Sequence, residues 1–450
     1  MSSMKNLRMV KSEEAISDKM SIFTVPPTDI ASEGRRIMTI SNKNPPTDNV
    51  VLFTFEVSGG YMIVMDEIEF EVKGKVVNGD GSTLDAMATG SWSSADATLK
   101  TKMQKSDVMP VNQLLFSLFK HARIRIQDQY IDLNDFHVRA LLNTICNTRY
   151  GNVERFIAQM YSEQVGKNAD KYSIIRQHPS YNILGSVAGK LIKESREFQM
   201  RGKIPLDITS INKYMLSRVP ITIELLFNSP ATYLRSSKTD ASFKFEMTDC
   251  KLFVPTVKVR PDVEVANGEI LKKQPALYPF ERTVLRTFAV PSGNITFETE
   301  DLFQGKVPMQ TLIFMVSSTN CSPGYKNNPF HFQHFKLGEI NYKVDDNVQS
   351  MKMKFGTDSG DSQATQPYAA FVNMFPELEI SLNEFITDTP FFAFDSRNSF
   401  DSTGSLPMIK KGMTSLEMRF DEALENNITL FVYAKFPTVM QIDEARNVSI

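Results

Sequence analysis

Residues 201–237, RGKIPLDITSINKYMLSRVPITIELLFNSPATYLRSS, decide how the chain divides. The pattern predicts a strand, a short helical turn, a second strand over ITIELLF, and then a turn of small polar residues. Pro220 and Pro230 bracket the second strand, and proline limits the spread of a strand into neighbouring pairings. Nothing in this stretch suggests catalysis. We therefore expect two structural units, with a boundary between residues 228 and 242.

Strand patterns lie on both sides of this boundary. Before it, the run YMIVMDEIEFEVKGKVVNGDGS at 61–82 alternates apolar and acidic residues and ends in a strong turn signal. After it, five more apolar runs are bounded by Pro, Gly, Asn or Asp: 243–259, 283–290, 309–316, 338–344 and 427–436. The chain also has 32 phenylalanines and one tryptophan. Aromatic side chains and frequent turns are typical of stacked antiparallel sheets, which predicts an all-β chain with two sandwiches.

The remaining segments complete the predicted domain organisation. Residues 1–48 are polar and contain two Pro-Pro pairs, which favours an extended arm. Residues 49–234 form the predicted first sandwich, with a helical insertion at 134–200 that includes an amphipathic pattern over 182–200. Residues 110–119 predict a short helix before the alternation resumes. Residues 235–450 form the predicted second sandwich, and the polar stretches 78–108 and 356–367 are expected to be loops.

Composition narrows the class of protein. The net charge of −2 argues against a protein that coats nucleic acid through bulk positive charge. The three cysteines are far apart, which argues against a disulfide framework and favours folding in a reducing compartment such as the cytosol. The first 20 residues lack the apolar core of a signal peptide, and no run of 18 apolar residues predicts a membrane span.

Motifs for chemistry are also missing from the sequence. His331 and His334 stand three apart in HFQH, a spacing that places them on opposite faces of an extended strand. His121, His137 and His178 have no partner at zinc spacing. No phosphate-binding glycine loop and no nucleophile elbow occurs. We therefore predict no catalytic, cofactor-binding or metal-binding residues and no enzyme activity.

Several motifs in order along the chain resemble those of one family, the double jelly-roll major capsid proteins (hexons) of Polinton/Maverick-type, adintovirus-like viruses. The resemblance covers residues 50–450 and rests on the order of the motifs, since none of them is diagnostic alone. In the first half the matching positions are Pro110, Val111, Asn112, Leu115, Ser117, Leu118, Phe119, Arg139, Ala140, Gly202, Leu206, Asp207, Tyr214, Met215, Leu216 and Val219. In the second half they are Tyr278, Pro279, Arg282, Gly293, Leu302, Phe303, Gly305, Pro308, Asn328, Pro329, Phe330, Phe332, Phe394, Asp395, Gly412, Leu416, Arg419, Phe420, Leu424, Tyr433, Asp443 and Arg446.

This resemblance implies a fold and a function. The fold would be two eight-stranded jelly rolls in one chain, with 204–208 and 221–227 as closing strands of the first and 228–240 as the linker. The function would be structural: three chains would form a pseudo-hexagonal homotrimer, and trimers would tile an icosahedral shell around double-stranded DNA. The implied partners are neighbouring trimers, vertex (penton) and minor capsid proteins, and DNA only indirectly. The implied location is the virion capsid.

Three alternatives remain open at the level of sequence. A glycan-binding β-sandwich protein would need an exposed aromatic platform, for which only Trp92 is available. A glycosidase would place two carboxylates about 5–9.5 Å apart in a cleft. The vertex protein of the same viruses is usually a single jelly roll, for which this chain is too long.

Overall fold

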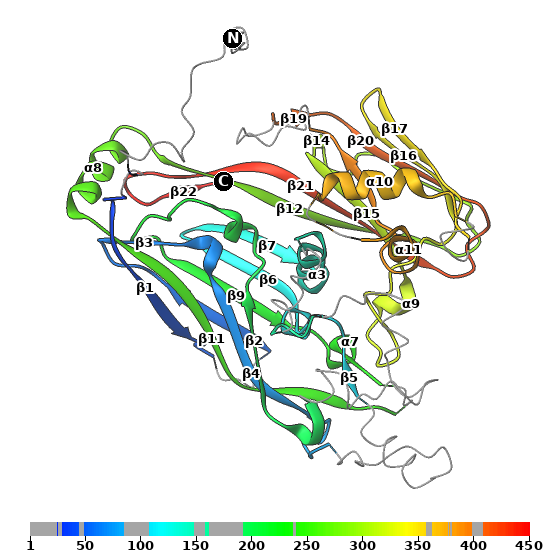
Figure 1. The fold of residues 1–450 in the computed structure, drawn as a ribbon, viewed down its shortest axis with the longest axis horizontal. Helices are drawn as coiled ribbons and strands as arrows, with labels where there is room; N and C mark the ends of the chain where they lie inside the picture. Colours follow the sequence, from blue (N-terminus) through cyan, green and yellow to red (C-terminus); the bar gives the residue numbers. More distant parts are fainter. Residues whose placement is uncertain are drawn as a thin grey trace, which may run out of the picture.

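The computed structural model describes residues 25, 29–44, 49–84, 108–147, 158–161, 192–236, 240–356, 362–376, 378, 380–397 and 408–450. Figure 1 shows two β-sandwiches side by side, with two long strands, β12 and β21, running from the second sandwich across the first. All strand pairs within these described residues are antiparallel.

The first sandwich has two facing sheets with four main strands each. One has the order β1 (Ser32–Ser41), β11 (Phe243–Val259), β4 (Glu69–Asn78) and β8 (Phe198–Lys203). The other has the order β2 (Val50–Phe55), β9 (Ile221–Phe227), β6 (Phe119–Ile126) and β7 (Gln129–Asn134). The short strand β3 (Tyr61–Ile63) pairs with the end of β11, and β5 (Met109–Pro110) pairs with β10 (Leu234–Arg235).

The second sandwich repeats this arrangement. One sheet has the order β12 (Ala276–Val290), β21 (Ile428–Ile442), β15 (Gln310–Ser317) and β18 (Phe392–Asp395). The other has the order β13 (Thr296–Thr299), β20 (Thr414–Phe420), β16 (Leu337–Val344) and β17 (Asn347–Lys352). Two short pairings join it: β14 (Lys306–Val307) with β19 (Lys410–Lys411), and β22 (Val448–Ser449) with β21.

Both sandwiches are jelly rolls with identical strand order. If the eight main strands of each are numbered along the chain, the sheets read 1-8-3-6 and 2-7-4-5 in both cases. This is the order of a jelly roll, in which paired strands wind into two facing sheets. The predicted fold class, an all-β chain of two eight-stranded jelly rolls with short helices, is confirmed.

Sheet pairing does not follow the predicted boundaries. Strand β1 lies within the predicted arm at 1–48, yet it pairs with β11 from Ser32 to Ser41. Strand β11 lies beyond the predicted boundary at 228–242, yet ten of its residues pair with β4 of the first jelly roll. The segment 204–208 is no strand, since 3-10 helix η4 (Asp207–Ser210) begins there. The first jelly roll therefore closes on β11, which pairing over a long sequence separation decides.

Helices are short and lie in the connections. They are α2 (Leu114–Ser117), α3 (Phe136–Asn147), α7 (Pro230–Tyr233), α8 (Pro261–Leu271), α9 (Ser318–Cys321), α10 (Thr365–Met374) and α11 (Leu382–Thr387), with 3-10 turns η2 (Met65–Glu67) and η3 (Lys193–Ser195). Most of the predicted helix at 182–200 lies outside the described residues. Its last residues begin strand β8, where Phe198 and Met200 alternate into the core. The short helix predicted at 110–119 ends at Ser117, and Phe119 begins β6.

Phenylalanine fills both cores, as the composition predicts. In the first jelly roll, Phe70 has ring centroids 5.9 Å from Phe53 and 5.7 Å from Phe119, in edge-to-face geometry. In the second, Phe314 is fully buried and stacks on Phe431 at 5.1 Å. The rings of Phe53, Phe70 and Phe119 fill the space between the two sheets of the first jelly roll, whereas Phe314 and Phe431 lie on neighbouring strands of one sheet.

Candidate functional site

The best-defined polar site lies at the junction of the two jelly rolls. Arg139 on α3 and Asp207 on η4 belong to the first jelly roll, and Thr283 on β12 belongs to the second. The Asp207 carboxylate accepts two hydrogen bonds from Thr283, from the backbone N–H at 2.9 Å and from the hydroxyl at 2.7 Å. Arg139 donates to the Thr283 hydroxyl oxygen at 2.6 Å and to the Asn134 carbonyl at 2.7 Å. One threonine thus joins a buried cation and a buried anion.

Burial controls the ionisation of this cluster. Arg139 and Asp207 are each only 7% exposed. Burial raises the pKa of the Asp207 carboxyl, and the Thr283 hydrogen bonds and the Arg139 charge oppose that rise. Burial likewise lowers the pKa of Arg139, which the Asp207 charge opposes. Each charge stabilises the other in its ionised form, so the arrangement serves as a fixed structural link between the jelly rolls.

Two tyrosines make further links across the junction. The Tyr278 hydroxyl on β12 donates to the Tyr214 carbonyl at 3.3 Å and accepts from the Leu216 N–H at 3.2 Å. The Tyr325 hydroxyl accepts from the Phe243 N–H at 2.9 Å and donates to the Phe243 carbonyl at 2.8 Å. Both tyrosines satisfy backbone groups of the first jelly roll, which fixes the second jelly roll against it.

Sequence alone left these positions as separate motifs. Arg139, Asp207 and Tyr278 were matched to the capsid family one by one, and the structure brings all three to the same junction. Thr283 was missed, because a threonine in a strand carries no local sign of such a contact. Gly202, another matched position, admits a close approach: a Cβ there would lie 2.2 Å from the Gln159 side chain.

His137 stands near the same junction without a catalytic partner. Its ring lies 6.1 Å from the ring of Phe330 in the second jelly roll. The residue is partly exposed, but its Nδ1 is buried and has no hydrogen-bond partner among the described residues. Desolvation lowers the pKa of His137 to about 4.

We expect His137 to make the protein less stable at acid pH. Below about pH 6.5, His137 binds a proton in the unfolded chain, whereas in the folded chain it binds one only near pH 4. The free energy of unfolding therefore falls as the pH is lowered from about 6.5 to about 4. The shift in pKa corresponds to a loss of about 3 kcal/mol in the free energy of unfolding. The measured loss should be smaller, because His137 is partly exposed and water screens its charge. Urea unfolding at pH 7 and pH 4.5 measures this change in the free energy of unfolding. His137→Phe should reduce this pH dependence; an unchanged slope in that variant would contradict the assignment.

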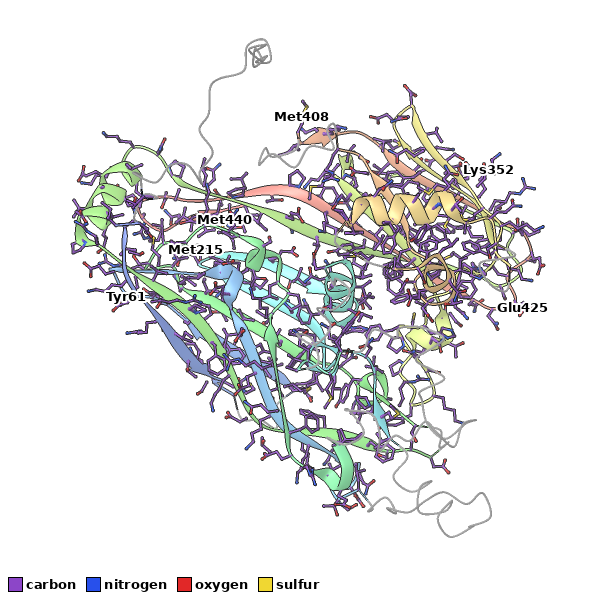
Figure 2. The ribbon with its side chains drawn as sticks, in the orientation of Figure 1. Tyr61, Met215, Lys352, Met408, Glu425 and Met440 are labelled. Carbon is purple, nitrogen blue, oxygen red and sulfur yellow. The ribbon has the colours of Figure 1, made fainter. Side chains whose placement is uncertain are left out.

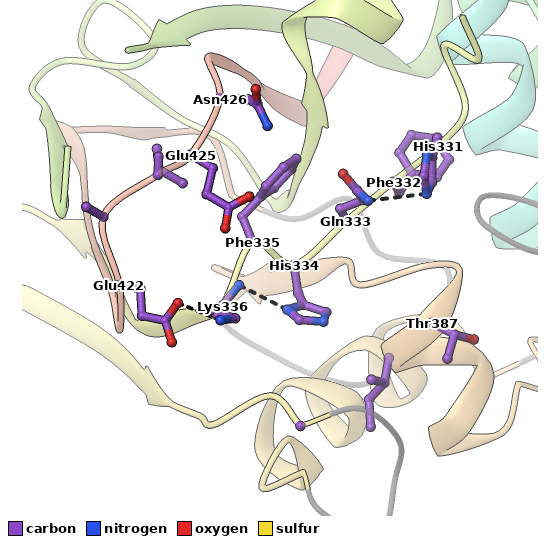
Figure 3. A pocket seen from close by; sticks show the side chains of 14 residues that line it. His331, Phe332, Gln333, His334, Phe335, Lys336, Thr387, Glu422, Glu425 and Asn426 are labelled. Atoms are coloured by element: carbon purple, nitrogen blue, oxygen red, sulfur yellow. Dashed lines mark hydrogen bonds and ion pairs between the residues drawn. The ribbon is translucent and has the colours of Figure 1, made fainter. Parts of the chain in front are cut away.

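A surface pocket of about 520 Å³ lies at one end of the second jelly roll, between the β15–β16 and β20–β21 connections. It contains the two histidines of HFQH (Figure 3). The backbone N–H of Lys336 donates to His334 Nδ1 at 3.1 Å, whereas His331 Nε2 lies 3.3 Å from the Gln333 amide. Lys336 also pairs with Glu422 at 2.5 Å. The histidines therefore serve separate local contacts within the pocket.

Other reactive groups are isolated. Cys146, Cys250 and Cys321 are all free thiols, and burial raises their pKa to about 12, 12 and 11, respectively. Within the described ranges, no cluster of three or more His, Cys, Asp or Glu side chains has the geometry to hold a metal ion. Over the same part of the chain, no helix is long and apolar enough to cross a membrane. Trp92 and His178 lie outside the described residues.

Solved structures of other proteins have a similar fold. No protein-family model matches the chain, and no curated protein matches its sequence. Among solved structures, a chain of the Sputnik virophage aligns with a TM-score of 0.64 and 10% identity, over 99% of this chain and 95% of that one. The major capsid protein of mavirus aligns with a TM-score of 0.54 and 10% identity, over 99% and 96%.

A third similar structure is the Faustovirus major capsid protein, with a TM-score of 0.52 and 10% identity, over 93% of this chain and 92% of that one. The alignments cover both jelly rolls together. The chain therefore shares the double jelly-roll fold of viral major capsid proteins, over nearly its whole length.

Proposed function

We propose that this chain is the major capsid protein of an icosahedral double-stranded DNA virus, a structural protein without catalytic activity. The observation that carries the proposal is the repeated strand order: two complete jelly rolls of the same topology, held in one fixed relation by the buried junction. Its likeness to the mavirus and Faustovirus major capsid proteins covers more than nine tenths of each chain. A fixed pair of similar sandwiches is a building block for a shell.

The finer parts of the proposal concern lineage and partners. The order of motifs from Pro110 to Arg446 supports a Polinton/Maverick-type or adintovirus-like virus. The proposed assembly is a homotrimer with six jelly rolls in a ring, which contacts neighbouring trimers and the vertex and minor capsid proteins. The proposed location is the virion shell.

We also propose two domains with a revised boundary. The first comprises residues 29–259 and the second 276–450, and the helix α8 connects them. The pairing of β1 and β11 with β4 supports this division, because every main strand then lies in the domain that contains its hydrogen-bonded neighbours.

The proposal predicts a defined oligomer. Purified protein should give particles of three times the 50.9 kDa chain mass by mass photometry, and electron micrographs should show rings with three-fold symmetry. Closed rings are expected because a head-to-tail interface between identical chains closes when its rotation divides a full turn. A monomer throughout a concentration series up to the micromolar range would overturn the proposal.

A further inference from the structure

The two jelly rolls correspond residue by residue at their fourth and seventh strands. Strands β6 and β16 each have eight residues, and both show a register shift after their first residue. In the first jelly roll the last residue of β6, Ile126, pairs with Ile221 at the start of β9. In the second, the last residue of β16, Val344, pairs with Thr414 at the start of β20. Ile221 and Thr414 are therefore equivalent positions.

The segments that precede these two strands differ sharply in exposure. Met215 and Leu216, six and five residues before Ile221, are 0% and 7% exposed. Met408 and Ile409, six and five residues before Thr414, are 71% and 70% exposed. In Figure 2, Met215 lies between the two jelly rolls, whereas Met408 lies on the side of the second that faces away from the first.

The buried segment contacts both jelly rolls, since Met215 forms an isolated β-bridge with Ile63 of the first. The backbone of residues 214–216 meets Tyr278 of the second jelly roll through two hydrogen bonds. Among the described residues, none covers the equivalent segment, where Met408 and Ile409 stay 71% and 70% exposed. Two large apolar side chains remain in water, where their burial would be favourable.

The strand-by-strand correspondence of the two jelly rolls also identifies the surface on which Met408 and Ile409 would pack. In each jelly roll, the first residue of the third strand pairs with a residue of the eighth strand. That residue of the eighth strand pairs in turn with a residue of the first strand. This path runs from Glu69 through Phe253 to Thr39, and from Gln310 through Lys435 to Thr283. Thr39 on β1 therefore corresponds to Thr283 on β12. Five residues earlier, Gly34 corresponds to Tyr278, and their partners Lys258 and Met440 correspond as well.

Strand β1 has an open surface at this place. It lies at the edge of its sheet, and none of its ten residues is fully buried. Ile37 is 53% exposed, and a Cβ at Gly34 would meet nothing within 4 Å. The two cations of β1 already have partners, since Arg35 pairs with Glu67 and Arg36 lies over the Tyr61 ring.

We propose that Met408 and Ile409 of one copy pack on the β1 edge of another copy, around Gly34 and Ile37. The proposed contact between chains occupies the position that residues 214–216 occupy against β12 within a chain. It rests on the proposed function, because it names the surface through which the capsid subunit assembles. The interface is head-to-tail, with different surfaces on the two partners, as a ring requires. Gly34 stands where β12 has Tyr278, so the contact between chains would rest on apolar packing instead of hydrogen bonds to a tyrosine hydroxyl.

The first test replaces the apolar pair by charges. In Met408→Asp/Ile409→Asp, we expect the dissociation constant of the oligomer, measured by sedimentation or mass photometry, to rise at least tenfold while the melting temperature of the monomer is kept. Ile37→Asp should act in the same direction from the other side. The matched control is Val348→Asp on β17. Val348 is 50% exposed and is equivalent to Tyr130 of the first jelly roll, which is itself 54% exposed.

The second test is a cross-link that does not depend on weakening assembly. Gly34→Cys combined with Ile409→Cys should form disulfide-linked dimers and trimers under mild oxidation, whereas each single variant should remain uncrosslinked. An oligomeric wild type whose assembly resists the aspartate pair, or a double-cysteine variant without intermolecular disulfides, would overturn this inference alone. A monomeric wild type would overturn the proposed function with it.

Discussion

Asp207→Ala is expected to lower the free energy of unfolding by about 3–5 kcal/mol, because it leaves a buried cation without its anion. Arg139 would stay 7% exposed beside a neutral side chain, and the Thr283 N–H and hydroxyl would both lose their acceptor. Since the carboxylate joins the two jelly rolls, calorimetry should also separate their unfolding into two transitions. Chemical unfolding monitored by circular dichroism measures the free energy.

Two comparisons make this result specific. Asp132→Ala removes an exposed carboxylate that pairs with Arg123 at 2.7 Å, and it should cost less than about 1 kcal/mol. Replacing Arg139 and Asp207 together by apolar residues, as Arg139→Met/Asp207→Leu, should recover most of the loss, because no buried charge then remains unpaired. A loss below about 1 kcal/mol in Asp207→Ala would show that the junction does not depend on this charge.

Phe314→Ala is expected to destabilise the second jelly roll by about 3–5 kcal/mol. The ring is fully buried on β15 and lies 5.3 Å from both Phe332 and Phe391 and 5.1 Å from Phe431. Its removal would leave a cavity in this cluster of rings, and close packing lets the neighbouring rings fill it only in part. The melting temperature measured by calorimetry should fall by several degrees.

Phe297→Ala supplies the matched control. Phe297 on β13 is only half-buried and has one aromatic neighbour, Phe288, at 5.9 Å. Phe297→Ala should lower the free energy of unfolding by less than half as much as Phe314→Ala, because the Phe297 ring buries less apolar surface. Equal effects of the two substitutions would mean that the rings around Phe314 do not form a tightly packed core.

Strand positions are the part of the fold that the sequence predicts well. The runs at 221–227 and 243–259 coincide with β9 and β11, and the other apolar runs after residue 201 overlap β12, β15, β16 and β21. Alternation and turn residues are local signals, so they mark where a strand begins and ends. The all-β class and the two sandwiches follow from these signals and from the abundance of phenylalanine.

Strand partners are the part that local signals do not determine. The pattern of β11 shows a strand but says nothing of its neighbours, and the sequence assigned it to the second unit. In the structure it pairs with β1 and β4, more than 160 residues earlier in the chain. Arg139, Asp207 and Thr283 meet for the same reason. Which strands and side chains meet over such separations depends on how whole sheets close and pack, and only the tertiary structure decides it.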